Sequence, residues 1–176
     1  MTFTWRATFG RADQPSPERY ELIETDFGFT AESTITIANP ARAHRIVGSS
    51  APTTKRHMRN AWYMPFCRRL DMEYPSGIRH IIFNSATPID DGSIKLVQIL
   101  YRNDTEADCS TEELIDWDAA IIEEDREVLE STDPDAAIDM SRKAEAHMPS
   151  DRPGMIMRNR LLALLKQHGE EEVYNL

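Results

Sequence analysis

The sequence predicts an α+β domain in which an antiparallel sheet carries helices on one face. Two observations lead to this prediction. Residues 1–103 contain runs rich in β-branched and aromatic residues, separated by turn residues, which is typical of strands. From Ser110 onward the apolar residues recur with the period of a helix, so we expect residues 110–169 to be helical. A chain of 176 residues is long enough for one domain with a sizeable core.

Six segments have the composition of strands. We expect a tight hairpin at Asp26-Phe27-Gly28, between the first two, and a turn at residues 88–93, before the last. Pro65 closes the fourth segment. The segments are Arg19–Thr25, Phe29–Ile37, Arg42–Val47, Lys55–Phe66, Ile78–Ala86 and Ile94–Tyr101.

The last predicted strand is apolar on both of its faces. A strand that is wet on one side should alternate between apolar and polar residues. Here Ile94, Leu96 and Leu100 share one face, and Val97, Ile99 and Tyr101 share the other. We therefore expect a helix to cover one face and the wall of a pocket to cover the other.

The helical part begins with a capping box in which Ser110 is the N-cap and Glu113 is at N3. This helix should continue to about Ser131. A shorter helix is expected over Asp135–Ala146, and a last one from about Arg152 to His168. Around that last helix, Asp151 is a candidate cap, Pro153 lies in the first turn and Gly169 ends the helix.

Two acidic residues lie on the apolar stripe of the first long helix. The stripe repeats every seven residues, and Asp118 and Asp125 fall within it. A carboxylate on a buried face costs several kcal/mol unless an Arg, a cap, a metal or a water-filled pocket compensates it. Alternatively, the stripe opens onto solvent at these points, or a Lys or Arg pairs with the acids. The apolar positions are Leu114, Ile115, Ile121, Ile122, Val128 and Leu129.

Charge and motif content exclude several classes of function. Of the 30 acidic residues, 15 lie between Asp104 and Asp139 with a single base, Arg126, so a nucleic-acid surface is not expected. No apolar run approaches the ~20 residues that span a membrane, and no signal peptide precedes the domain. We expect a cytoplasmic protein in which Cys67 and Cys109 are free thiols. Neither a nucleophile elbow nor a glycine-rich phosphate loop is present.

Three stretches of the chain resemble the Rieske non-haem iron oxygenases, in particular the branch of vanillate and dicamba O-demethylases. The acidic pair Glu124-Asp125, followed by Arg126 and by the apolar Val128, is similar to the motif of that family's long C-terminal helix. A "TP…RN" hairpin and the terminal helix of the same branch are also matched. These last two matches comprise Asn84–Asp91 with Tyr101–Asn103, and Asp151–Gly154 with Arg158–Leu162.

The resemblance implies a helix-grip fold of the START or Bet v1 type, here the C-terminal part of a catalytic domain over residues 1–176. In that fold a long helix crosses the concave side of an antiparallel sheet. The resemblance further implies that Asp125 is the carboxylate ligand of a mononuclear Fe(II). The associated reaction is O2-dependent hydroxylation or O-demethylation of an aromatic or similar apolar substrate, with electrons arriving through a [2Fe–2S] Rieske centre.

Other parts of the family's iron chemistry have no counterpart here. The facial triad needs two histidines beside the carboxylate, and the Rieske centre needs two Cys and two His. The five histidines, at positions 44, 57, 80, 147 and 168, form no close pair. In the family the two ligands precede the carboxylate by more than a hundred residues, and would fall just before Met1. We therefore expect no iron binding and no activity by this chain alone.

Three explanations stay open for the missing ligands. Another chain or segment supplies the Rieske domain and the histidines, or the chain is a truncated product. Alternatively, the domain is a non-catalytic helix-grip protein that binds an apolar small molecule. An unrelated α+β binding protein remains a further possibility. As part of an oxygenase the chain would also need a ferredoxin or reductase as electron donor, and family members often form trimers.

Four residues are candidates for substrate contact. Asn84 lies where some relatives place a polar substrate contact, and its amide can bond a carboxylate or a phenol. His80 shares a strand face with it, and Trp62 and Tyr63 are candidates to line an aromatic cavity. Each also has an explanation without a functional role. Asn84 would be an ordinary strand residue before a turn, and His80 a hydrogen-bonded core histidine. Trp62 and Tyr63 would be aromatic residues of the core.

Overall fold

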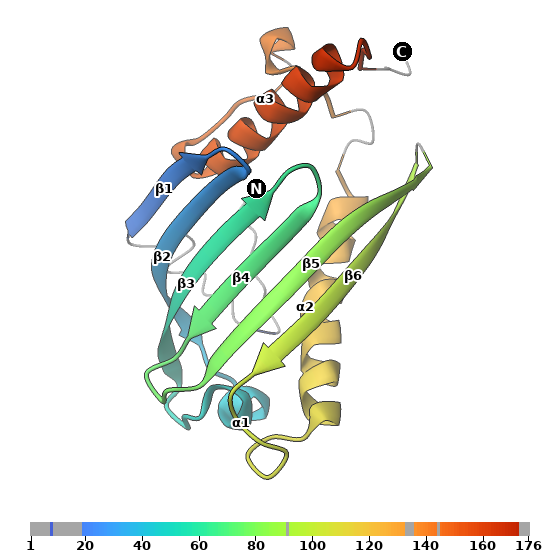
Figure 1. Ribbon diagram of the computed structural model, residues 1–176. Helices are drawn as coiled ribbons and strands as arrows, with labels where there is room; N and C mark the ends of the chain where they lie inside the picture. Colours follow the sequence, from blue (N-terminus) through green and yellow to red (C-terminus); the bar gives the residue numbers. More distant parts are fainter. Residues whose placement is uncertain (1–7, 9–18, 91, 133–135, 144, 173–176) are drawn as a thin grey trace.

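The computed structural model describes residue 8 and residues 19–90, 92–132, 136–143 and 145–172 (Figure 1). Six strands form one antiparallel sheet in the order β1-β2-β3-β4-β5-β6. Each strand therefore pairs with its neighbour in the chain. The strands are β1 Arg19–Thr25, β2 Gly28–Ala38, β3 Thr53–Tyr63, β4 Cys67–Glu73, β5 Arg79–Asp90 and β6 Ser93–Arg102.

The longest helix runs along one face of the sheet, behind β5 and β6 in Figure 1, and this confirms the predicted α+β helix-grip fold. We call the face against which it packs the inner face and the opposite one the outer face. None of the helices in the described residues is long and apolar enough to cross a membrane. The helices are α1 His44–Val47, α2 Thr111–Glu130 and α3 Arg152–Gln167, with 3-10 turns η1 Ala41–Ala43, η2 Met140–Arg142 and η3 Pro149–Asp151.

Most of the predicted elements are confirmed. The hairpin between β1 and β2 turns at Asp26-Phe27, and Gly28 pairs with Thr25 at its closed end. The capping box is present at the start of α2, with Ser110 accepting from the backbone of Glu113 and Glu113 from that of Ser110. Pro153 lies in the first turn of α3, and Gly169, at φ 72°, follows its end.

The prediction of a strand over Arg42–Val47 is wrong, because this segment forms η1 and α1. Pro40 supplies the fixed backbone angle at the N-cap, and Gly48 ends α1 in the left-handed conformation at φ 66°. Between them Ala43, Ile46 and Val47 occupy one side of the turn and are buried in the core. Composition alone favoured a strand here, whereas the apolar residues recur every three to four positions, which places them on one face of a helix.

A strand that composition did not indicate, β4, follows a turn at Met64–Phe66. Its outer positions carry the charged residues Arg69, Asp71 and Glu73, so its mean hydropathy is low. Its inner positions Leu70 and Met72 are buried. The strand belongs to a sheet that is covered on one face only, and this explains the alternation.

The outer face of β6 also differs from the prediction, since no described element covers it. Val97, Ile99 and Tyr101 are 43%, 47% and 61% exposed. Helix and cavity both lie on the inner face, where Leu100 packs against the main core. The apolar character of the outer positions thus reflects strand propensity rather than burial in this domain.

The main core joins α1, the first half of α2 and the inner face of the sheet. Leu114 and Trp117 of α2 are buried there with Ile46 and Val47 of α1. Polar contacts reinforce the junction, because Arg45 bonds the Glu113 carboxylate at 3.0 Å and Arg42 stacks over the Trp117 ring at 4.6 Å. Together these contacts fix the start of α2 relative to the sheet.

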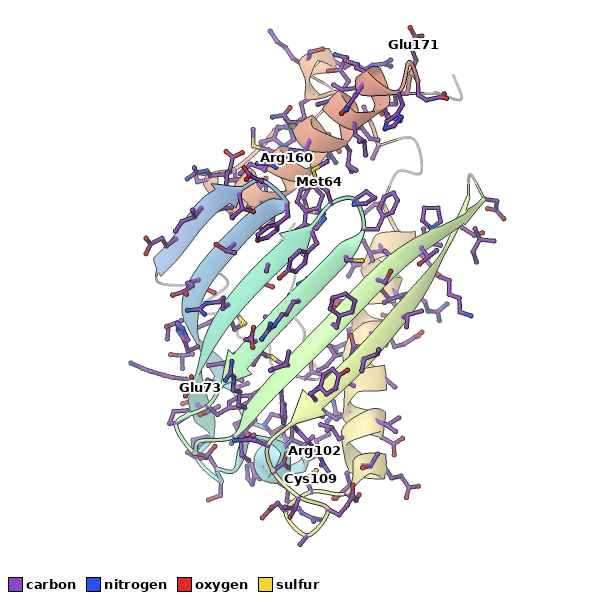
Figure 2. The ribbon with its side chains drawn as sticks, viewed as in Figure 1. Met64, Glu73, Arg102, Cys109, Arg160 and Glu171 are labelled. Carbon is purple, nitrogen blue, oxygen red and sulfur yellow. The ribbon has the colours of Figure 1, made fainter. Side chains whose placement is uncertain are left out.

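The chain between β6 and α2 is held by Arg102 and by the buried Cys109, which lie together at this end of the sheet (Figure 2). Arg102 Nη1 donates to the Cys109 carbonyl at 2.6 Å, and Nη2 bonds Glu106 at 2.8 Å. Cys67 and Cys109 are both free thiols, as expected.

The second cluster of the core lies at the other end of the sheet, where α3 packs. Ile156 and Met157 contact a group containing Phe29 and Trp62. Near this junction Figure 2 shows Arg160, whose guanidinium bonds Glu24 of β1 at 3.3 Å. The helix therefore packs on the inner face at one end of β1–β3, whereas α2 lies over the rest of the inner face.

Two predictions about the C-terminal region need correction. Of the expected helix over Asp135–Ala146, residues 135 and 144 lie outside the described residues and the rest contains only η2. Asp139 accepts from the backbone of Ser141, and Lys143 takes the left-handed conformation at φ 55°, which ends the turn. Asp151 does stand at the N-cap of α3, but its carboxylate accepts from the Met148 backbone and caps η3 instead.

Gly48→Ala should destabilise the protein by roughly 1 to 3 kcal/mol more than Gly77→Ala. Both glycines have positive φ, at 66° and 87°, so both variants carry a similar backbone cost. A Cβ on Gly48 would lie 2.8 Å from Ile78 Cδ1, whereas one on Gly77 meets nothing within 4 Å. Denaturant unfolding of the two variants measures the difference. Equal destabilisation would show that α1 is not packed closely against the turn after β4.

Candidate functional site

A cavity of about 370 Å³ lies between α2 and the inner face of β2–β6. Its size falls within the usual range for small-molecule sites, roughly 300–1,000 Å³. The helix contributes Trp117, Ile121 and Ile122 to its wall, together with the acids Asp118 and Asp125. Asp118 and Asp125 of the apolar stripe of α2 therefore face a cavity and not a closely packed core, which lowers the cost of placing them there.

The strand register arranges the sheet wall in three rows. Leu70, Ile82 and Leu100 lie opposite one another on β4, β5 and β6 and form an apolar row. On one side of it, Arg68, Asn84 and Gln98 form a polar row. On the other side the row is Met72, His80 and Arg102. All of these residues except Leu100 and Arg102 line the cavity. A ligand would therefore lie on Leu70 and Ile82, between the polar row and His80.

The helix wall follows from the spacing of residues in α2. Trp117 and Ile121 are three and seven residues after Leu114, so all three project from the same side of the helix. Asp118 and Asp125 are seven residues apart on that side, or two turns. Because Leu114 and Trp117 are anchored in the core, both acids line the cavity, and the Asp118 carboxylate reaches Gln98 of the sheet.

Asp118 is joined to the polar row of the sheet by hydrogen bonds. Gln98 Nε2 donates to Asp118 Oδ2 at 2.5 Å, and Asn84 Nδ2 donates to Gln98 Oε1 at 2.5 Å. Burial raises the pKa of the Asp118 carboxyl, and the hydrogen bond from Gln98 partly offsets this effect. The three side chains connect α2 to β6 and β5 across the cavity.

His80 and Tyr74 form the other polar end of the cavity. His80 is 3% exposed, and its ring meets that of Tyr74 edge-on at 5.8 Å between centroids. Burial lowers the pKa of His80, against the opposing influence of the Asp104 carboxylate. Burial also raises the pKa of Tyr74, although the hydrogen-bonded Arg56 guanidinium favours its ionised form. His80 is therefore a neutral imidazole at pH 7.

Asp125 lies half-buried on the cavity wall, one repeat further along α2 than Asp118. A carboxylate oxygen is a suitable ligand for Fe(II), as in the facial triad of two histidines and one carboxylate. Within the described residues, no three side chains of His, Cys, Asp or Glu gather into a potential metal centre. At this position the described part of the chain therefore presents a carboxylate without two neighbouring histidines.

Of the four predicted substrate-contact residues, two line the cavity and two do not. Asn84 and His80 are on its sheet wall. Trp62 is buried in the cluster below α3, and its indole donates to the Pro65 carbonyl at 3.2 Å. Tyr63 points to the outer face and stacks on Phe27, with ring centroids 4.7 Å apart. Adjacent strand residues point to opposite faces, so both could not have lined one cavity.

Several cavity residues were missed in the sequence. Gln98 is the single polar residue on its face of the predicted strand Ile94–Tyr101, and that contrast was an available signal. Trp117 lies three residues after Leu114 and four before Ile121, so it belongs to the stripe. Arg68 could not be placed because its strand was not predicted. Nothing in the local pattern around Arg56 marked it as buried.

Fold and site together define a helix-grip domain whose long helix carries an acidic residue into a ligand cavity. A family model for the vanillate O-demethylase oxygenase C-terminal domain matches residues 1–167, and the chain belongs to that family. It is accordingly a catalytic domain of the Rieske-type oxygenase class, whose members generally use non-haem Fe(II) and a [2Fe–2S] cluster. Comparison with curated proteins finds no match.

The pKa of His80 predicts a loss of stability on mild acidification. An unfolded chain binds a proton near the ordinary value of 6.5, whereas the folded chain resists protonation. The free energy of unfolding should therefore fall as the pH drops below about 6.5, and be fully restored above it. Unfolding curves between pH 5 and 8 measure the effect. His80→Gln should flatten this dependence, whereas replacing the exposed His57 by Gln should leave it in place.

Proposed function

We propose that this chain forms the substrate pocket of a Rieske-type oxygenase and supplies Asp125 as the carboxylate ligand of its mononuclear iron. The reaction is O2-dependent hydroxylation or O-demethylation of an aromatic or similar apolar compound. One observation carries the proposal: the acid that the family motif picks out is on the wall of the cavity. A surface acid in the same helix, such as Asp116, has no such position.

The residues of the cavity have separate roles in this proposal. Leu70 and Ile82 of the apolar row would bind the ring of the substrate and exclude water. Asn84 would hydrogen-bond a polar substituent. Asp125 would hold the metal two helical turns from Asp118, so the reacting carbon is expected at the Asp125 end of the cavity.

Bound Fe(II) would supply O2 activation at its open coordination positions. In an O-demethylation one oxygen atom enters a C–H bond of the methoxy group, and the resulting hemiacetal separates into a hydroxyl compound and formaldehyde. The second oxygen atom leaves as water, which requires two electrons and two protons. A Rieske centre and a ferredoxin or reductase would deliver the electrons. The two histidine ligands and the Rieske centre would come from another chain or segment, and a trimer could bring such parts together.

A second candidate function uses the same cavity without chemistry. A helix-grip domain can bind an apolar small molecule through the cavity alone, and the continuous apolar row favours such binding. The two candidates make the same prediction for ligand binding and opposite predictions for iron. The iron measurement therefore separates them, and the ligand-binding experiment that follows it tests the cavity that both candidates share.

Asp125→Ala should remove mononuclear iron from the protein when it is co-expressed with a chain that carries the histidine ligands. The loss of iron affinity should be larger than the roughly 10- to 100-fold loss caused by removing a residue that only hydrogen-bonds a metal ligand. Iron is measured as the ferrous–nitrosyl signal in electron paramagnetic resonance, which the [2Fe–2S] centre does not give. Asp116→Ala, an exposed acid on the same helix, is the control. Unchanged iron in Asp125→Ala would end the ligand assignment and favour the non-catalytic candidate.

Ile82→Trp should fill the cavity and weaken the binding of anisole by at least roughly tenfold. Phe83→Trp is the matched control, because Phe83 is the next residue on β5 and points to the outer face. Ligand-observed NMR titration of the chain measures both affinities, and circular dichroism checks the fold. If anisole binds both variants equally, the aromatic ligand does not occupy the cavity under α2.

A further inference from the structure

The hydrogen-bonded series of Asn84, Gln98 and Asp118 has a fixed direction. Each member comes from a different element, β5, β6 and α2, and each is half-buried on the cavity wall. The two hydrogen bonds are short, at 2.5 Å each. Amide side chains have a donor and an acceptor end, so such a series can run in either of two senses.

The carboxylate determines which sense is taken. An ionised Asp118 can only accept, so Gln98 must turn its Nε2 toward the carboxylate. Gln98 Oε1 is then left facing Asn84, which must respond with its own donor, Nδ2. Asn84 Oδ1 is consequently not used by Gln98 and remains as an acceptor on the cavity wall.

We propose that Asp118 is a positioning residue that acts through Gln98 to hold Asn84 with Oδ1 toward the ligand. The site would thereby select aromatic ligands that carry an O–H or N–H donor over those that offer an acceptor alone. This inference rests on the proposed function of the cavity as a substrate pocket, and names the class of substrate that it takes.

The neighbourhood of Asn84 supports the same selectivity. Arg68, across the strand pair, has its Nε donating to Asn60 Oδ1 at 2.9 Å, and its guanidinium also lines the cavity. A ligand hydroxyl can donate to Asn84 Oδ1 and still accept from a guanidinium. A ketone or ether has only the second option, and leaves Asn84 Oδ1 without a donor when the cavity is closed over it.

Burying Asp118 is unfavourable for folding, which indicates a role other than stability. The pKa of its carboxyl is raised by burial, so ionisation is less favourable here than it is in water. An asparagine would make the same contact with Gln98 without the charge. It would, however, be able to donate or to accept, and would leave the direction of the series undefined.

The test compares 1-phenylethanol with acetophenone, which share a skeleton and differ in donor capacity. The wild-type chain should bind the alcohol about tenfold more tightly, since the ketone leaves a buried acceptor unpaired. Asp118→Asn should raise the affinity for acetophenone by up to about fivefold, because half of the molecules would now present Asn84 Nδ2. Structural damage alone would not produce this gain of affinity. Asn84→Leu should bring the alcohol down to the level of the ketone.

Asp116→Asn, on the exposed side of α2, is the control and should keep the wild-type preference. Affinities come from ligand-observed NMR titration, and thermal unfolding verifies that each variant is folded. Equal binding of the two probes to the wild-type chain, or an unchanged preference in Asp118→Asn, overturns the inference but leaves the pocket in place. Failure of the wild-type chain to bind either probe overturns the proposed pocket as well.

Discussion

The burial of Leu114 and Trp117 in the core that α1 shares with the sheet determines where α2 lies. A helix of 20 residues that is fixed at its first two turns projects its later residues along a defined line. That line passes over β4–β6, and the acids two and four turns from the start are brought over the inner face. The capping box and the contacts of Arg45 fix the same end, so the position of the cavity depends on this one junction.

The side chains between α2 and the inner face of β4–β6 do not fill the space between them, and this leaves the cavity. At the β1–β3 end, α3 packs directly on Phe29 and Trp62 and leaves a continuous core. Under α2 the row of Arg68, Asn84 and Gln98 replaces such packing beside Leu70 and Ile82. The hydrogen bond from Gln98 to Asp118 then satisfies polar groups that a dry interface would have excluded.

Much of this could be predicted from the sequence, and the failures have physical causes. Strands with apolar alternation, the capping box and the stripe of α2 are local signals, and they gave the fold class and the place of Asp125. The strand β4 was missed because its charged outer positions dominate its composition. The segment around Ile46 was predicted as a strand because four residues of helix are too short to establish a helical period.

The cavity required information that no local pattern holds. Asn84, Gln98 and Arg68 come together through strand register, which depends on the pairing of three strands at once. Asp118 was recognised as unusual, but its partner lies 20 residues away on β6. Trp62 and Tyr63 were grouped as aromatic residues, although neighbours on a strand face opposite ways.

The order of the strands has a consequence for how the cavity comes into being during synthesis. Every strand pairs with the one made just before it, so the sheet can grow as a succession of hairpins with short loop closures. The helix bearing Asp118 and Asp125 emerges after β6 and docks onto a surface that already exists. The sheet wall of the cavity is therefore in place before α2 docks, and the docking of this helix is the step that creates the binding site.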